Sequence, residues 1–180
     1  TKKPLTVTAV TDTKAYDGTA TSSGGPILSG STPLVPGDIA PVWTQSFNNK
    51  NAGSNKVLTP AGLVNDGDGG KNYAYTYATN ATGVITRRPI SVTAFTDSKA
   101  YDGSSSSSVL PALSAGTPLA AGDSEPVWTQ TFANKNVGTG KTLTPAGAVL
   151  DGNGGLNYTY NFFPDITGVI TSRAITLTPL

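Results

Sequence analysis

Two glycine-rich loops hold the side chains with the clearest potential for metal chemistry. The segment Asp66-Gly67-Asp68-Gly69-Gly70 returns later in the chain as Asp151-Gly152-Asn153-Gly154-Gly155. Oxygen ligands that alternate with glycine turns are typical of calcium loops, and calcium takes about six to eight oxygens. No Glu follows either loop at EF-hand spacing, so backbone carbonyls, Asp12 or Asp17 would have to complete the shell. The calcium candidates are Asp66, Asp68, Asp151 and Asn153. The alternative is a plain glycine turn that starts the next strand.

Aromatic residues after each loop suggest a second chemistry, stacking on sugar rings. They alternate along residues 72–77, and residues 157–162 repeat the pattern. Alternation places them on one face of a strand. Core packing is the favoured interpretation, because a small domain with few Leu and Ile needs aromatic area, and Phe162 replaces the third tyrosine without a hydroxyl. The sugar-binding candidates in these ranges are Tyr73, Tyr75, Tyr158 and Tyr160. The two Trp residues, Trp43 and Trp128, are candidates as well and have the same favoured interpretation.

Enzymatic activity is not expected from this composition. The chain has no His and no Cys, and no Ser lies in a nucleophile-elbow context. Most Asp residues lie beside Gly, which is typical of turns. We therefore expect no catalytic residues and no cofactor other than calcium.

Charge and composition narrow the partners and the location. Lys and Arg number 12 against 11 acidic residues, a net charge of +1. This balance gives no electrostatic basis for binding nucleic acid or an anionic membrane. No apolar run approaches the roughly 20 residues of a membrane span. With no Cys, stability must come from packing and backbone pairing. The Thr, Asn and Gly content suits an extracellular protein, and we expect any secretion signal to lie outside this segment.

The chain is a tandem repeat with a period of 85 residues. Residues 4–88 and 89–173 align without a gap and are identical at 51 of 85 positions, or 60%. This period exceeds that of solenoid repeats and suits a small domain with its own core. We expect domains at 1–88 and 89–173. Residues 174–180 either start a third repeat or close the second.

Short strands should build each repeat, and no long helix is predicted. The expected strands of the first repeat are residues 5–10, 42–47, 56–64, 72–77 and 83–86. Pro60 in the third of these implies an edge position or a bulge. Only residues 87–89 separate the last strand from the next repeat, too few for a flexible linker. A shared extended segment over residues 83–95 would run about 43 Å and favour a semi-rigid rod.

Three spaced motifs carry a family resemblance. They are Lys14-x-Tyr16-Asp17-Gly18, Asn49-Lys50-Asn51-x-Gly53 and Gly70-x-Asn72-Tyr73, and all three return at the 85-residue offset. Together they resemble the YDG/MBG repeats, which occur in tandem in large secreted bacterial adhesins, including filamentous-haemagglutinin-like proteins. The resemblance implies compact β-rich domains, β-grasp-like in topology, on the bacterial cell surface. It implies no catalytic residues.

These observations predict a mainly β protein with two tandem domains. The expected topology is β-grasp-like, with an immunoglobulin-like sandwich as the alternative. The expected function is a structural spacer that displays the adhesive regions of a surface adhesin. The alternative is an adhesion module that binds carbohydrate or a surface through aromatic strand faces. Expected partners are neighbouring repeats and, for the alternative, a glycan or a host or matrix surface, with the fragment itself monomeric.

Overall fold

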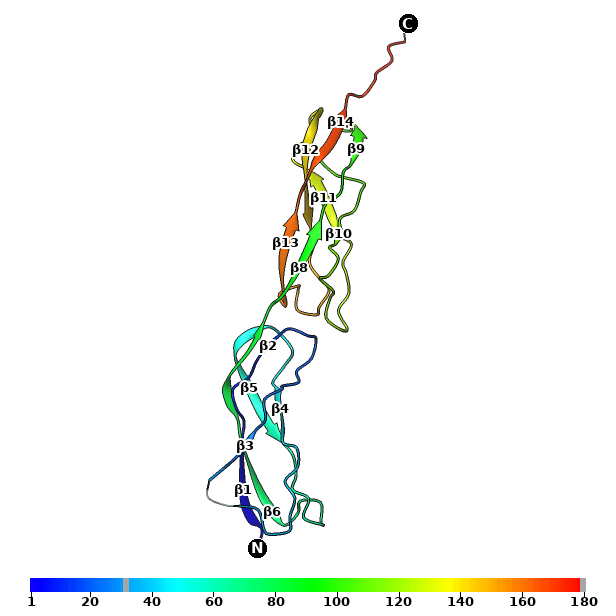
Figure 1. The fold of residues 1–180 in the computed structure, drawn as a ribbon. Helices are drawn as coiled ribbons and strands as arrows, with labels where there is room; N and C mark the ends of the chain where they lie inside the picture. The colour runs from blue at the N-terminus through cyan, green and yellow to red at the C-terminus, as the bar shows by residue number, and fades with distance from the viewer. Residues whose placement is uncertain (31–32, 179–180) are drawn as a thin grey trace. The chain divides into compact units, whose positions relative to one another are not determined.

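The protein is built from strands. The computed structural model describes residues 1–30 and 33–178, and no helix occurs in these ranges (Figure 1). The chain divides into two compact units, Thr1–Arg88 and Pro89–Leu180. The predicted mainly β class with two compact domains is therefore confirmed. The β-grasp-like topology and the immunoglobulin-like alternative stay predictions.

The first domain contains two small sheets. One sheet has the order β3-β1-β6, in which β1 is antiparallel to β3 and parallel to β6. The other has the order β2-β7-β5-β4, in which β2 is parallel to β7. The strands are β1 (Lys3–Thr8), β2 (Thr13–Ala15), β3 (Ile27–Ser29), β4 (Thr44–Phe47), β5 (Gly53–Ala61), β6 (Tyr73–Ala78) and β7 (Asn80–Thr86). Both the opening part of this domain, β1 and β2, and its closing part, β6 and β7, therefore contribute to both sheets.

The second domain repeats this topology. Its sheets have the orders β10-β8-β13 and β11-β12-β14-β9 (Figure 1). The strands are β8 (Arg88–Thr93), β9 (Ser98–Ala100), β10 (Ala112–Leu113), β11 (Thr129–Phe132), β12 (Gly138–Ala146), β13 (Tyr158–Phe163) and β14 (Asp165–Thr171). The sequence repeat is thus a structural repeat as well.

Strand β5, which carries Pro60, lies inside its sheet rather than at an edge. It pairs with β4 on one side and β7 on the other, and its pairing with β7 shifts register twice. The last pair with β7 joins Leu58 and Asn80, so Pro60 comes after the ladder that would need its N–H. Of the two alternatives that Pro60 implied, an edge position or a bulge, the structure shows the irregular pairing of β5 and not an edge strand.

Apolar and aromatic side chains fill the cores. Leu5, Val64 and Tyr73 form one buried cluster in the first domain, against which Trp43 and Tyr75 pack. In the second domain Phe132, Leu143 and Ile170 are buried in a cluster with Ala94, and Tyr101 packs against it. Burial of this aromatic and aliphatic area is the main stabilising contribution available to a chain without disulfides.

The two domains are joined with almost no linker. Only Arg87 lies between the end of β7 at Thr86 and the start of β8 at Arg88. Beyond β14, residues 174–178 form no strand and are exposed, and residues 179–180 lie outside the described part. In the described residues we find no helix with the length and apolar character of a membrane span.

Candidate functional site

The Tyr-Asp-Gly motif forms a turn that a lysine holds closed. In the first domain Lys14 Nζ donates to Asp17 Oδ1 at 2.8 Å and to the Thr19 carbonyl oxygen at 2.9 Å. The same ammonium lies 5.7 Å from the centre of the Phe47 ring. Tyr16 is fully buried beneath the turn, and its N–H donates to the Thr86 carbonyl at the end of β7. The motif therefore ties the opening segment of the domain to its last strand.

The second domain has the same lysine-held turn, with more hydrogen bonds. Lys99 Nζ donates to Asp102 Oδ1 at 3.0 Å and to the Ser104 and Ser106 carbonyls at 3.0 and 2.8 Å. The Ser104 N–H and the Lys99 ammonium lower the pKa of Asp102 to about 2. Lys99 also lies 5.5 Å from the centre of the Phe132 ring. Lys99 and Asp102 are thus bonded to each other and to the backbone of their own turn.

The calcium-candidate loop of the first domain is organised by backbone N–H groups. Asp66 Oδ1 accepts from the N–H groups of Asp68 and Gly70 at 2.9 and 2.8 Å, and Oδ2 accepts from Asn72 N–H at 3.0 Å. Burial opposes ionisation, but these N–H groups outweigh it and lower the pKa of Asp66 to about 2. Asp68 is exposed and makes an ion pair with Lys71 at 3.5 Å.

The loop of the second domain has the same arrangement around a buried carboxylate. Asp151 is 3% exposed and accepts N–H groups from Asn153, Gly155 and Asn157 at 2.7, 2.8 and 3.1 Å. Asn153 also donates through Nδ2 to Asn157 Oδ1 at 3.1 Å. Across the described ranges, no three His, Cys, Asp or Glu side chains gather as a metal site would require. The geometry favours the turn interpretation, and calcium binding stays a prediction.

Replacing Asp151 by Ala should destabilise the second domain in metal-free buffer. The change leaves three backbone N–H groups without their acceptor, two of them on buried Gly155 and Asn157, and we expect a loss of about 2–3 kcal/mol. Urea unfolding with a chelator present measures the loss, and Asp151→Asn, which keeps one acceptor oxygen, should lose less. A loss seen only after calcium is added would instead make Asp151 a metal ligand.

The sugar-binding candidates are largely withdrawn from solvent. Tyr73, Trp128 and Tyr158 are 2%, 4% and 1% exposed. Trp43, Tyr75 and Tyr160 are half-buried. The structure brings Trp43, Tyr73 and Tyr75 together in the core of the first domain, and it places Trp128 edge-on to Tyr160 at 6.5 Å in the second. These six residues form no exposed row.

The tyrosine hydroxyls bind the loops of their own domains. Tyr73 accepts from Val35 N–H at 2.9 Å and donates to Asp38 at 2.6 Å, and Tyr158 makes the same pair of bonds. Burial first, and then the bond to Asp38, raise the pKa of Tyr73. Tyr75 accepts from Val64 N–H at 2.9 Å. The aromatic strand therefore organises the long loops that precede it.

A buried glutamine in each domain was not singled out by the sequence analysis. Gln45 is 4% exposed, accepts from Val10 N–H at 2.9 Å and donates to the Val10 carbonyl at 2.9 Å. Gln130 is 2% exposed and makes the same two bonds to Phe95, at 2.9 and 2.7 Å. The available signal was alternation, because Gln45 shares a strand face with Trp43 and Phe47, whose side chains point inward.

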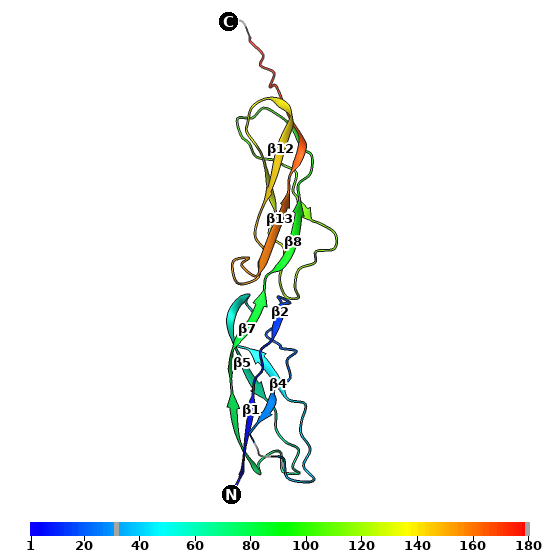
Figure 2. The ribbon, with the colours of Figure 1, turned by 60° about the vertical axis from the view of Figure 1, so that its left-hand side comes forward.

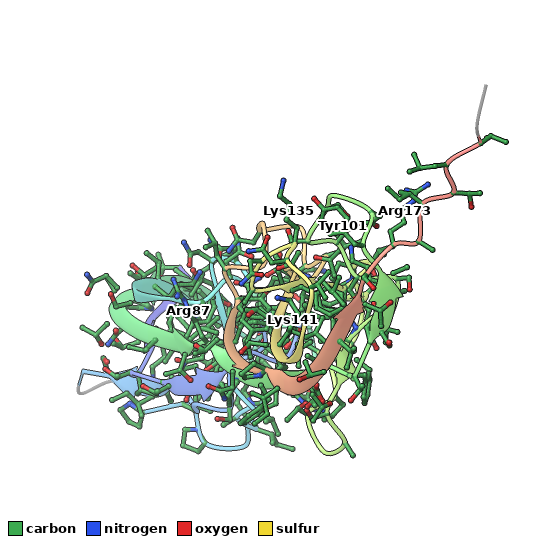
Figure 3. All side chains as sticks on the ribbon, turned by 90° about the horizontal axis from the view of Figure 1, so that it is seen from above. Arg87, Tyr101, Lys135, Lys141 and Arg173 are labelled. Atoms are coloured by element: carbon green, nitrogen blue, oxygen red, sulfur yellow. The ribbon has the colours of Figure 1, made fainter. Side chains whose placement is uncertain are left out.

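The Asn-Lys-Asn turn is held by a lysine of the following strand. Lys56 is 7% exposed and donates to Asn49 Oδ1, and burial lowers the pKa of Lys56. In the second domain Lys141 Nζ donates to Asn134 Oδ1 at 2.6 Å. Lys141 lies among the strands while Lys135 points away from the domain (Figure 3). Lys56 and Lys141 are therefore bonded within the turns of their own domains.

Low pH should unfold both domains, whereas changes of pH near neutrality should leave their stability unchanged. A carboxylate with a folded pKa below its unfolded value stabilises above about pH 4, and this contribution is lost as pH falls toward the folded pKa. The pKa is lowered at Asp12, Asp17, Asp66, Asp97, Asp102, Asp151 and Asp165. With no His in the chain, Tm should be flat between about pH 5 and 8 and fall steeply below about pH 4. Calorimetry across this pH range measures Tm, and a marked loss of stability near pH 6 would contradict the expectation.

Comparison with known proteins identifies the repeat. The family model of the YDG domain matches residues 1–81 and again residues 86–168. Searches of curated proteins and of solved structures found no match. The matched ranges cover most of the chain and include the lysine-held turn, the N–H-organised loop and the aromatic strand in each copy. The chain therefore belongs to the YDG domain family and contains two of these domains in tandem.

Proposed function

We propose that these domains are spacer repeats of a bacterial surface adhesin, secreted and displayed at the cell surface. In this role they extend the chain as a semi-rigid rod and carry adhesive regions outward. The observation that carries the proposal is the junction, where only Arg87 separates β7 from β8. A single residue between two paired strands leaves few backbone angles free to bend. The partners of each domain are then its neighbours in the same chain.

The use of the chemistry-bearing side chains supports a structural role. The lysine-held turn, the Asp66 and Asp151 loops and the buried tyrosine hydroxyls all bond to their own domains. Nothing in these arrangements requires a ligand to satisfy a buried polar atom, since every buried side-chain N or O atom of the described residues has a partner. We propose accordingly that the domains have no catalytic role.

Small-angle X-ray scattering tests the rod directly. We would compare this two-domain chain with a four-domain chain made by repeating residues 4–173. The maximum dimension should double, in proportion to domain number, as expected for a rod. The control inserts a flexible Gly-Ser segment after Arg87, which should broaden the distance distribution. If the insertion leaves the scattering unchanged, the natural junction is already flexible and the rod proposal fails.

A carbohydrate-binding role is the second candidate, and the outer aromatic rings favour it. Tyr77 and Phe162 are each 37% exposed. Their rings stack on Tyr75 and Tyr160 at 5.8 and 5.6 Å between centres. A glycan array probed at high protein concentration tests this role, with a Tyr77→Ala/Phe162→Ala double variant as control. Selective binding that the double variant loses would identify an adhesion module and displace the spacer proposal.

A further inference from the structure

The first and last segments of each domain run side by side in the same direction. In the first domain, β1 and β6 pair in parallel from Lys3 with Tyr73 to Thr8 with Ala78. The pairing resumes in the second sheet, where β2 and β7 join Thr13 to Val84 and Ala15 to Thr86. One opening segment, residues 3–16, thus lies along one closing segment, residues 72–86, through both sheets (Figure 2).

Backbone hydrogen bonds continue outside the named strand pairs. Ala9 N–H donates to the Ala78 carbonyl at 2.9 Å, and Val84 N–H donates to the Asp12 carbonyl at 3.0 Å. Tyr16 N–H closes the series on the Thr86 carbonyl at 2.9 Å. The two segments are therefore bonded at both ends of the gap between β1 and β2.

The second domain has the same series at equivalent positions. Ala94 N–H donates to Phe163 at 2.9 Å, and Val169 N–H donates to Asp97 at 3.0 Å. Tyr101 N–H donates to Thr171 at 2.8 Å. The opening segment is residues 88–101 and the closing segment is residues 158–171. Recurrence in both domains indicates that the arrangement belongs to the repeat itself.

Parallel pairing decides how tension acts on a domain. A pull on the N-terminal side draws β1 backward along its axis, and a pull on the C-terminal side draws β7 forward along its own. The two segments are then sheared past each other, and their hydrogen bonds bear the load together rather than one after another. The load passes from one end of the domain to the other through this pair of segments. Residues 17–71, which join the two segments along the chain, therefore bear little load until the segments separate.

We propose that each domain is a shear clamp, in which the paired opening and closing segments resist tension applied between the two ends of the domain. Buried side chains reinforce the pair, since Leu5, Val7 and Ile85 are at most 1% exposed. Gln45 braces the gap by bonding both backbone groups of Val10, the stretch where the opening segment leaves one sheet for the other. The clamp is a property of the single domain. Its use in bearing tension along a surface stalk rests on the function proposed above.

The chain connectivity fits a load that passes from domain to domain. The closing strand β7 is followed after Arg87 by the opening strand β8 of the next domain. Tension therefore enters each domain through its opening segment and leaves through its closing segment, without first crossing a loop.

Single-molecule pulling between introduced cysteines tests the clamp, because the chain has no Cys of its own. In the 180-residue chain, Lys2→Cys with Arg87→Cys loads the first domain in shear. Lys2→Cys with Lys71→Cys pulls β1 and β6 apart from the same end, so their bonds open one at a time. All three positions are exposed, so both variants should fold. The unfolding force should be several-fold higher in shear than in the peeling geometry.

The second domain offers a matched repetition. Arg87→Cys with Ser172→Cys gives shear, and Arg87→Cys with Leu156→Cys gives peeling, again at exposed positions. Equal unfolding forces in the two geometries would overturn the clamp. Shear resistance in a chain whose scattering shows a flexible junction would keep the clamp and defeat the rod, so the two proposals can fail separately.

Discussion

Replacing Tyr158 by Ala is expected to unfold the second domain while the first stays folded. Tyr158 is 1% exposed, and its hydroxyl accepts from Ala120 N–H at 2.9 Å and donates to Asp123 at 2.7 Å. Removing a buried aromatic ring costs about 3–5 kcal/mol. Domains of this size have about 4–13 kcal/mol of stability in total. Ala120 and Asp123 each lose a hydrogen bond as well, so a domain in the lower half of that range is left with little or no net stability.

The repeat supplies the control for this variant. Tyr73→Ala removes the equivalent side chain of the first domain, which is 2% exposed and makes the same bonds to Val35 and Asp38. It should unfold the first domain and spare the second. Tyr158→Phe keeps the ring and removes only the hydroxyl that accepts from Ala120, so a loss of about 1–3 kcal/mol is expected.

Urea unfolding followed by circular dichroism and Trp fluorescence measures these effects, since each domain contains one of the two Trp residues. Tyr158→Ala should leave a single transition, at the position of the first domain, with about half the native dichroism signal. A single transition that retains the full amplitude and shifts as a whole would show that the two domains unfold together, against this expectation.

Local patterns in the sequence were sufficient for the inward-facing residues. Alternation along residues 72–77 correctly places Tyr73 on a buried face, because strand side chains alternate whatever the partner strand is. The 85-residue repeat likewise indicates two domains with the same topology. These features depend on neighbours in the chain and can be read from it.

Features that depend on distant parts of the chain could not be predicted. The first strand was expected at residues 5–10 but ends at Thr8, because the Gln45 side chain takes both backbone groups of Val10. The parallel pairing of β1 with β6 joins residues 70 positions apart, and no turn motif specifies such a crossover.

The candidate site shows the same limit. Spacing identifies Asp66 and Asp151 as oxygen donors at a glycine turn, but it does not say what they bind. The backbone conformation determines which groups of the loop itself they bond, because it aims three N–H groups at each carboxylate. That conformation depends on positive φ at the loop glycines, such as 79° at Gly67 and 73° at Gly152.

Replacing Gly147 by Ala should destabilise the second domain by at least about 2 kcal/mol, from backbone strain and crowding of a core ring. Gly147 has φ of 146°, a conformation that L residues rarely adopt. A Cβ placed there would lie 2.4 Å from Cε3 of Trp128 and 2.9 Å from Cζ3. The Trp128 ring cannot retreat easily, because Nε1 donates to Glu125 at 2.9 Å and the ring lies edge-on to Tyr160.

Gly152→Ala separates the two causes within the same domain. Gly152 has φ of 73°, and nothing lies within 4 Å of a Cβ built there, so this variant pays for strain without crowding. We expect it to lose about 1 kcal/mol. Gly62→Ala repeats the test in the first domain, where the Cβ would lie 2.6 Å from Cε3 of Trp43. Urea unfolding followed by Trp fluorescence measures all three, and the emission of Trp128 should change in Gly147→Ala alone. If Gly147→Ala costs no more than Gly152→Ala, the indole moves freely, and the close packing of Trp128 on the Gly147 backbone does not stabilise this domain.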